Sequence, residues 1–154
     1  MRRRCSKIYK GTQKGIITSL IDLLNENFSE SLGLTVRFDE LSPAKDSICM
    51  TTAVDSKVTE EETDVTGGCT TMFIRLCIIY RVLDNVLTGS RNLDIIETLD
   101  NLFYYLQSHA RKLEFEDGKL ERVKLEYGAK LDKVYDNGIK DFRNCFIIQF
   151  SRFL

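Results

Sequence analysis

The segment from Cys69 to Val82 constrains the fold most strongly, because its side chains alternate like those of one long β-strand. One face is apolar, whereas the other mixes apolar residues with two arginines. The apolar face carries Met72, Ile74, Leu76, Ile78, Tyr80 and Val82, and the mixed face carries Phe73, Arg75, Cys77, Ile79 and Arg81. Strands that are buried on both faces have nearly continuous hydrophobic sequences, so this segment is predicted to be a central strand. Its two arginines must then reach solvent, a carboxylate or another subunit.

A second strand pair is predicted in the last 35 or so residues. Arg122–Tyr127 and Asn144–Phe150 both alternate, and the turn residues Asp136-Asn137-Gly138 lie between them. Gly128 interrupts the first of these strands, which predicts a β-bulge there. The sequence stops within the second strand. We therefore expect a small sheet whose edges must be covered, because unpaired backbone donors attract another chain.

Two segments have the three- and four-residue spacing of apolar side chains that indicates amphipathic helices. The first runs from about Thr12 to Phe28, and Thr12 can accept a backbone hydrogen bond as its N-cap. The second begins near Ser90 or Asn92 and ends near Ala110. Its acidic residues come first and its basic residues last, which suits the helix dipole. Each helix needs a broad apolar surface beneath it, and a sheet face would supply one.

Two shorter strands, Leu34–Phe38 and Ser47–Thr52, complete the predicted elements. The order is therefore helix, short strands, long strand, helix and two further strands. This order predicts an α+β fold, with a mixed or antiparallel sheet of about five strands and two main helices packed on it. We expect a basic N-terminal arm at residues 1–11 and a single domain at residues 12–154, with an extended loop or hairpin at residues 52–68.

Charge is unevenly distributed along the sequence. The formal net charge is −1, so the overall charge indicates no polyanionic partner. Residues 1–14 nevertheless carry arginines and lysines without any acidic residue, and Glu60-Glu61-Glu62-Thr63-Asp64 forms an acidic cluster. A basic arm can bind nucleic acid by releasing counterions, and the alternative interpretation is a solvated terminus.

The cysteines form an odd set without the close spacing of a metal knuckle or a redox pair. They are Cys5, Cys49, Cys69, Cys77 and Cys145. We therefore expect reduced structural thiols, as in a cytosolic protein, in preference to a disulfide framework. The N-terminal arginines are not followed by the apolar segment of a secretory signal. No apolar run approaches the roughly 20 residues that a bilayer span requires, so no integral membrane protein is expected.

No group of residues has the spacing of a catalytic or metal site. His109 is the single histidine, and it lies among basic residues at a predicted helix end. This position favours a surface residue that compensates the helix dipole over a general base. The acidic groups at Glu60–Asp64 and Glu114–Asp117 lack the pattern of a calcium-binding loop. Gly67-Gly68 precedes a strand and lacks the lysine of a phosphate-binding loop. We therefore predict no enzyme activity, no catalytic residue, no metal and no cofactor.

The order of these elements resembles that of the tail terminator proteins of long-tailed bacteriophages and phage-derived tail particles, also called tail completion or minor capsid proteins. The segments that carry the likeness are Thr12–Phe28, Ile48-Cys49-Met50, Gly67-Gly68 with the long strand Met72–Arg81, the leucine- and aromatic-rich helix Leu93–Leu106, and the closing segment Phe142–Phe150. The resemblance covers about residues 12–153. It lies in the order of the elements and the style of the strands.

This resemblance implies an α+β structural subunit that closes into a hexameric ring at the head-proximal end of the tail tube. Such a ring ends tube polymerisation and provides the head–tail joining surface. The implied partners are further copies of the chain, the tail tube protein, head connector and neck proteins, the sheath protein in a contractile tail, and passing DNA without specific binding. The implied location is the neck end of the virion tail, with the host cytoplasm during assembly.

The resemblance also implies roles for two groups of residues. In a ring that closes by rotation, each edge of a subunit meets a complementary edge of the next. The subunit contacts are expected at or near the mixed face of the long strand, at Phe73, Arg75, Ile79 and Arg81. The lumen or tube-facing surface is expected at the acidic residues Glu60, Glu61, Glu62 and Asp64, where like charge keeps DNA from adhering.

Three alternative functions stay open. A head–tail connector or joining ring belongs to the same structural class. A small ligand-binding regulatory domain would use the sheet face as a pocket, and an enzyme would use the acidic groups with a divalent cation. Ring formation separates the first class from the other two. A cation-dependent melting shift that disappears in Glu61→Ala/Glu62→Ala would identify the enzyme.

Overall fold

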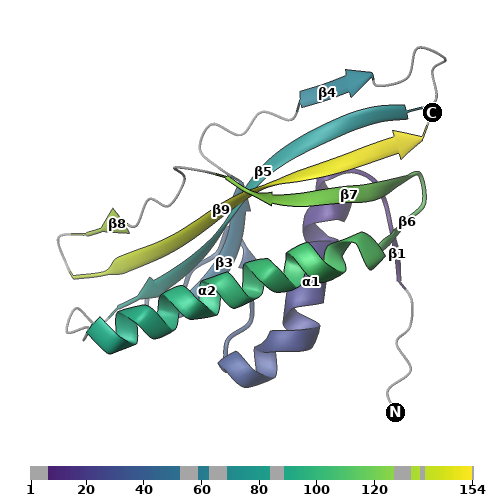
Figure 1. Ribbon diagram of the computed structural model, residues 1–154. Coiled ribbons are helices and arrows are strands. Elements are labelled where there is room, and N and C mark those ends of the chain that lie inside the picture. Colours follow the sequence, from purple (N-terminus) through teal and green to yellow (C-terminus); the bar gives the residue numbers. More distant parts are fainter. Residues whose placement is uncertain are drawn as a thin grey trace.

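The chain forms a long, twisted sheet with both long helices on one of its faces, as the computed structural model shows (Figure 1). The structure describes residues 7–52, 59–62, 69–83, 89–126, 133–135 and 138–153. The helices in these ranges are α1 (Gln13–Leu32), α2 (Gly89–His109) and a short 3₁₀ helix (Ala110–Lys112). The strands are β1 (Ile8–Tyr9), β2 (Arg37–Phe38), β3 (Ser47–Thr52), β4 (Thr59–Glu62), β5 (Cys69–Val82), β6 (Glu114–Phe115), β7 (Gly118–Leu125), β8 (Lys133–Val134) and β9 (Lys140–Phe153).

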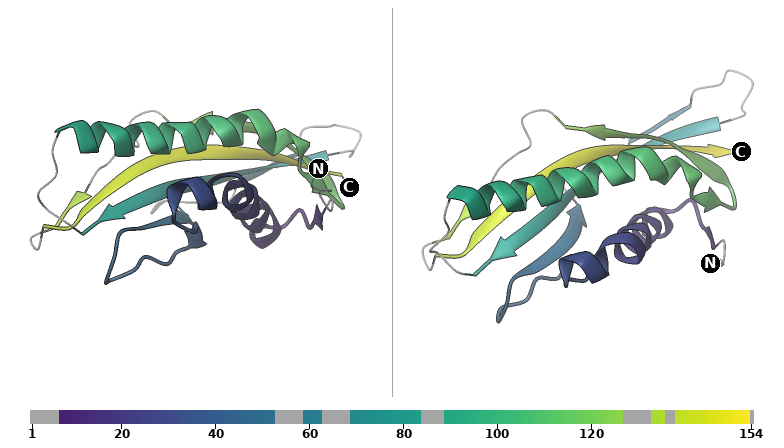
Figure 2. Two further views of the ribbon diagram at one scale, coloured as in Figure 1. Left: turned by 90° about the horizontal axis from the view of Figure 1, so that it is seen from below. Right: turned by 60° about the horizontal axis from the view of Figure 1, so that its bottom comes forward.

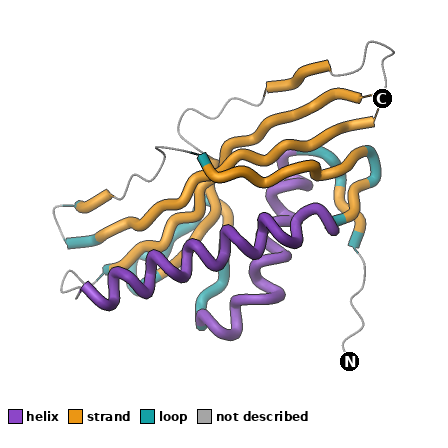
Figure 3. The backbone as a smooth tube through the Cα atoms, in the orientation of Figure 1, coloured by secondary structure: helices purple, strands orange, loops and turns teal. Residues whose placement is uncertain are grey.

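The two long strands β5 and β9 form the spine of the sheet and pair antiparallel along their whole length. The main path runs β2-β3-β5-β9-β7. On the outer side of β5, β3 pairs with one half and β4 with the other, and β7 and β8 divide the outer side of β9 in the same way. The tube drawing in Figure 3 shows these strands running side by side. Because β2 pairs parallel with β3, the sheet is mixed, and β1 and β6 form a separate small parallel sheet.

The core lies between the two helices and the apolar face of the spine. The buried strand residues there include Met72, Ile74, Leu76 and Ile78 of β5 and Phe142, Phe146, Ile148 and Phe150 of β9. The helices contribute, among others, Ile16, Leu20 and Leu24 of α1 and Leu99, Leu102 and Leu106 of α2. Full burial of each such side chain stabilises the folded state by about 1.5–3 kcal/mol relative to leaving it in water. Both helices therefore cover the same face of the sheet, and Figure 2 shows this arrangement from two further sides.

Helix α1 begins where the sequence predicts and ends later. The Oγ1 atom of Thr12 accepts a hydrogen bond from the Gly15 N–H at 3.1 Å, which confirms the predicted N-cap. The helix continues past the predicted end at Phe28 to Leu32, and Gly33 follows with a left-handed φ of 64°. The Asn25 side chain of this helix bonds to the backbone of Val36.

The predicted strand at residues 34–38 is shorter than expected for a physical reason. The Asn25 side chain donates to the Val36 carbonyl at 2.9 Å and accepts from the Val36 N–H at 2.7 Å. These two bonds occupy backbone groups that a strand ladder would otherwise use. Only Arg37–Phe38 pairs with β3, as strand β2.

The predicted pairing of the two C-terminal segments is confirmed. Strand β7 lies antiparallel to β9, with Arg122 opposite Gln149 and Val123 opposite Ile148. A register shift separates Leu120 from Arg122 in this ladder. The bulge predicted at Gly128 lies outside the described residues.

The predicted α+β class, with a mixed sheet and two main helices, is confirmed. The main path has five strands, and β4 and β8 extend the sheet to seven. Strand β4 lies within residues 52–68, where the sequence predicts a loop or hairpin; residues 53–58 and 63–68 are outside the described part, as are residues 1–6 of the basic arm. None of the described helices combines the length and the apolarity that crossing a bilayer requires.

Candidate subunit-interaction surface

The face of the sheet opposite the two helices is the candidate functional surface. Four residues of β5 point to it, because the residues directly adjacent to them along the strand pack in the core on the other face. They are Phe73, Arg75, Ile79 and Arg81. In the β5–β9 register these four residues lie opposite Gln149, Ile147, Arg143 and Asp141. We call the surface formed by these eight residues the helix-free face. The structure thus brings the four predicted contact residues to one side of the sheet.

Arg75 is exposed on the helix-free face and makes an ion pair there. Its Nε atom lies 3.2 Å from Oε1 of Glu126, with 46% of the arginine side chain and 19% of the glutamate side chain exposed. The Glu126 carboxylate is mostly buried, so the pair holds Arg75 on this face, while nearly half of the arginine side chain stays accessible to solvent. Phe73, two residues earlier, is half-buried on the same face.

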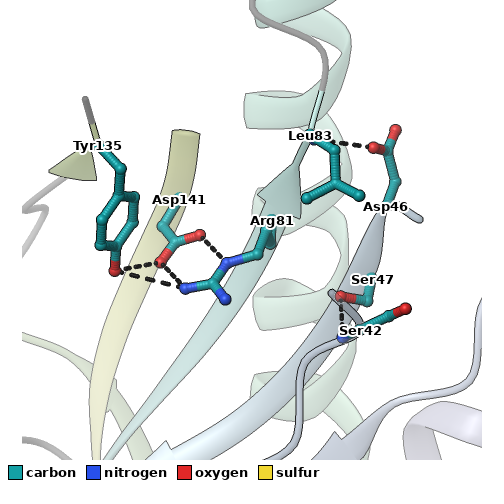
Figure 4. A network of polar contacts seen from close by, with 7 residues as sticks. All are labelled: Ser42, Asp46, Ser47, Arg81, Leu83, Tyr135 and Asp141. Carbon is teal, nitrogen blue, oxygen red and sulfur yellow. Dashed lines mark hydrogen bonds and ion pairs between the residues drawn. The ribbon is translucent and has the colours of Figure 1, made fainter. Parts of the chain in front are cut away.

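Arg81 differs from Arg75, because its charge is paired within the same chain (Figure 4). Its Nε and Nη2 atoms donate to the two carboxylate oxygens of Asp141 at 2.8 and 2.9 Å. The Tyr135 hydroxyl also donates to Asp141, at 3.0 Å. The hydrogen bond to Asp141 raises the pKa of Arg81 above its usual value, against the opposing effect of burial. This two-point geometry is among the stronger ion-pair arrangements and fixes the orientation of both side chains.

A second group of polar contacts lies beside this pair. The Asp46 carboxylate accepts from the Leu83 N–H at 3.0 Å and from Nη2 of Arg91 at 2.8 Å. Next to it, the Ser42 N–H donates to Oγ of Ser47 at 2.9 Å (Figure 4). These bonds tie the start of β3 to the end of β5 and to the first turn of α2. Contacts within the chain therefore fix the Arg81 end of the sheet.

Three cysteines, Cys49, Cys77 and Cys145, lie on the helix-free side of the sheet, and no pairing among them was predicted from the sequence. Cys77 and Cys145 face each other across β5 and β9 and form a disulfide bond. The expectation of reduced thiols is therefore wrong for this pair. The two cysteines are 68 residues apart, so only the strand register, which is a tertiary property, brings them together. Cys49 on β3 remains a free thiol, and burial raises its pKa to about 11.

An open depression of about 370 Å³ lies over this part of the sheet, lined by residues that include Cys49, Thr51, Ile79 and Arg143. Ile79 is buried beneath it. The Thr51 hydroxyl donates to Asp39 at its rim, at 2.8 Å. Among the residues that the structure describes, no group of three or more histidine, cysteine or acidic side chains could hold a metal ion.

The predicted lumen-facing residues lie at an edge of the sheet. Glu60, Glu61 and Glu62 belong to β4, which pairs antiparallel with the first part of β5. At this end of the sheet β4 is therefore outermost beside β5, and β7 is outermost beside β9. Asp64 lies outside the described residues. The direction that this edge faces in an assembly remains a prediction.

Sequence reasoning missed Asp141 and Tyr135, the partners of Arg81. A signal for Asp141 exists, because it continues the alternation of the closing strand onto the side of Arg143 and Cys145. Its position opposite Arg81 follows only from the register between β5 and β9. Tyr135 directly precedes the predicted turn residues Asp136-Asn137-Gly138, where no local pattern indicates a contact with Arg81 or Asp141.

Comparison with known proteins gives a match in fold. No protein-family model matches the sequence, and no curated protein matches it. A chain in a solved structure described as "Virion of native gene transfer agent (GTA) particle" has the same fold, with a TM-score of 0.59. The match covers 87% of this chain and 92% of that chain, at 13% sequence identity. The two chains thus share one α+β fold over nearly their whole lengths.

Proposed function

We propose that this chain is a structural subunit of a phage or phage-like particle. In this proposal it forms a ring at the head-proximal end of the tail tube, ends tube polymerisation and provides the head–tail joining surface. The observation that carries the proposal is the shared fold with a chain of a gene transfer agent virion, which covers 92% of that chain. Because a fold alone does not define a function, the proposal also draws on the order of elements that resembles tail terminator proteins.

The surfaces of the subunit suit this role. A ring that closes by rotation joins two different surfaces of each copy, and β4 and β7 are two different sheet edges. On the helix-free face, exposed Arg75 and half-buried Phe73 are accessible to a neighbouring protein. Ile79 and Arg81 lie in the same face and support its shape through burial and the bond to Asp141. The proposed partners are further copies of the chain, the tail tube protein, and head connector and neck proteins.

The test combines the purified chain with tail tubes assembled from the tube protein of the same particle. Native mass spectrometry and negative-stain electron microscopy should show annuli of one subunit number, seated at one end of each tube. Tubes capped in this way should stop growing. A chain that stays monomeric and leaves every tube end bare would refute the proposal. Rings that bind tail-free heads and ignore tube ends would instead identify a head–tail connector.

A matched pair of variants tests the helix-free face within the same experiment. Arg75→Glu places a negative charge beside Glu126 on this face and should weaken capping of the tubes. Lys14→Glu makes the same change of charge at an exposed position in the first turn of α1. Capping by the Lys14 variant should equal that of the unchanged chain. Equal capping by both variants would exclude Arg75 from the contacts.

A further inference from the structure

We propose that the side of strand β7 turned away from the helices is a contact surface for the phosphate backbone of a double-stranded nucleic acid. Three basic residues of this strand form the surface, and we call them the β7 cation row: Lys119, Arg122 and Lys124. All three are exposed. A basic surface can bind a nucleic acid whether or not the chain closes into a ring, so this proposal goes beyond the ring function.

The register between β7 and β9 places the β7 cation row on the same side of the sheet as the helix-free face. Its members Lys119, Arg122 and Lys124 lie opposite Ser151, Gln149 and Ile147. Paired residues of neighbouring strands share a face of the sheet, and the β9 residues that alternate with these three pack in the core. The bulge between Leu120 and Arg122 is what aligns the row, because it puts Lys119 and Arg122 on one face although they are three positions apart.

The spacing of the β7 cation row suits a polyanion with regularly spaced charges. Neighbouring members lie opposite residues two apart on β9, which corresponds to about 6.4–6.8 Å along the strand. Each strand of a DNA duplex carries a charge about every 3.4 Å along the axis, so successive cations can reach alternate phosphates. Ser151 and Gln149, half-buried beside Lys119 and Arg122, add neutral side chains of the kind that hydrogen-bond to phosphate oxygens.

The charges of the β7 cation row are available to a partner. Within the described part of the chain, none of the three residues makes an ion pair. Glu121 is the single acidic residue of β7, and Glu126, just after the strand, is paired with Arg75. The glutamates of β4 lie three strand spacings away, about 14 Å, which exceeds the screening length of about 10 Å at 0.1 M salt. Strand β7 is therefore locally basic although the whole chain has a net charge of −1.

A nucleic acid fits this surface better than an acidic protein does. Two members of the row are lysines, which are depleted in protein–protein interfaces, whereas lysine, arginine and polar side chains make contacts to phosphates. The β9 residues beside Lys119 and Arg122 are polar, whereas the centre of a protein-binding site is usually an aromatic or otherwise well-packed anchor. Contacts to phosphates carry no sequence information, so we expect binding without sequence preference.

The experiment measures binding of the whole chain to a fluorescently labelled DNA duplex of mixed sequence, by fluorescence anisotropy at several salt concentrations. Three phosphate contacts predict a slope of log K against log salt of about −2.7, so the affinity should fall about 40-fold between about 50 and 200 mM salt. Arg122→Gln/Lys124→Gln leaves one member of the row and should flatten the slope to about −0.9, a fall of about 3.5-fold over the same range.

The matched control removes the same two residue types elsewhere. Arg37→Gln/Lys45→Gln changes one exposed arginine in β2 and one exposed lysine in the segment before β3. Strand β2 is at the opposite end of the main path of the sheet from β7. The control should keep the slope of the unchanged chain, and circular dichroism should show that both variants are folded, since all four positions are exposed.

The possible results separate this proposal from its alternatives. A β7 variant with the same slope as the control would overturn it and assign the binding to another basic segment, such as residues 1–14. An unchanged chain that binds no duplex at low salt would overturn it as well. If the β7 variant loses binding to poly-glutamate and keeps its binding to DNA, the partner is an acidic protein instead.

The binding assay needs no tail tubes, so its result is independent of the capping experiment. A chain that caps tubes and binds no DNA would refute the nucleic-acid contact alone. A chain that binds DNA through the β7 cation row and never caps a tube would refute only the proposed ring function.

Discussion

Replacing Arg81 by methionine should destabilise the fold far more than the loss of an exposed ion pair. The variant removes two hydrogen bonds, of 2.8 and 2.9 Å, from an Asp141 side chain that is 1% exposed. An unpaired buried charge of this kind costs about 3–5 kcal/mol. We expect about 3 kcal/mol, at the lower end of that range, because 24% of the Arg81 side chain is in solvent and Tyr135 keeps its bond to the carboxylate. For a chain of this length the melting temperature should fall by about 6–12 °C.

Urea denaturation, followed by circular dichroism at a low protein concentration, measures this loss. Arg81→Met/Asp141→Leu should be more stable than Arg81→Met alone, because no charge is left buried without its partner. Arg37→Met is the matched control, since its pair with Glu40 has both side chains more than 60% exposed. The control should change the free energy of unfolding by about 0.5 kcal/mol or less. An Arg81→Met variant no less stable than this control would refute the view that Asp141 depends on Arg81.

Three further predictions concern the sheet. Reduction of the Cys77–Cys145 bond, or its removal in Cys77→Ser/Cys145→Ser, should lower the free energy of unfolding by up to about 4 kcal/mol, given a loop of 68 residues; equal urea midpoints with and without dithiothreitol would contradict this. Cys49 should react with iodoacetamide at pH 7 at least about a hundredfold more slowly than a free cysteine, because a pKa of about 11 leaves little thiolate. Its rate should rise as the pH approaches 11, and fast labelling of the folded protein at pH 7 would exclude the burial described here. Gly118→Ala should cost about 1–3 kcal/mol in urea denaturation, because a Cβ atom there meets the Ser151 carbonyl and the Phe150 ring; a neutral effect would show that β7 can shift against β9.

The elements that the sequence predicted well are those with a strong local pattern. β3 and β5 have the predicted bounds, and α1 has the predicted N-cap. In each case the signal is the period of the side chains or a capping group next to the element. The prediction failed where a distant side chain competes for the backbone, as Asn25 does at Val36. The segment at residues 34–38 alternates like a strand, yet only two of its residues pair as β2.

The candidate surface was only partly predictable. Alternation alone placed Phe73, Arg75, Ile79 and Arg81 on one face, and the structure agrees. It could not distinguish exposed Arg75 from Arg81, whose charge is satisfied by Asp141. Both arginines have the same place in the strand pattern. The difference arises from the residue that the register puts opposite each of them.

The two amphipathic helices, the long central strand and the closing strands follow from local patterns, because the period of the side chains is a local property of the chain. The order in which the strands pair is a property of the tertiary structure. That order puts Cys77 against Cys145 and Arg81 against Asp141, and it makes β4 and β7 the outer strands at one end of the sheet. The physical reason is that register and strand order depend on contacts between residues that lie far apart in sequence, which a local pattern does not encode.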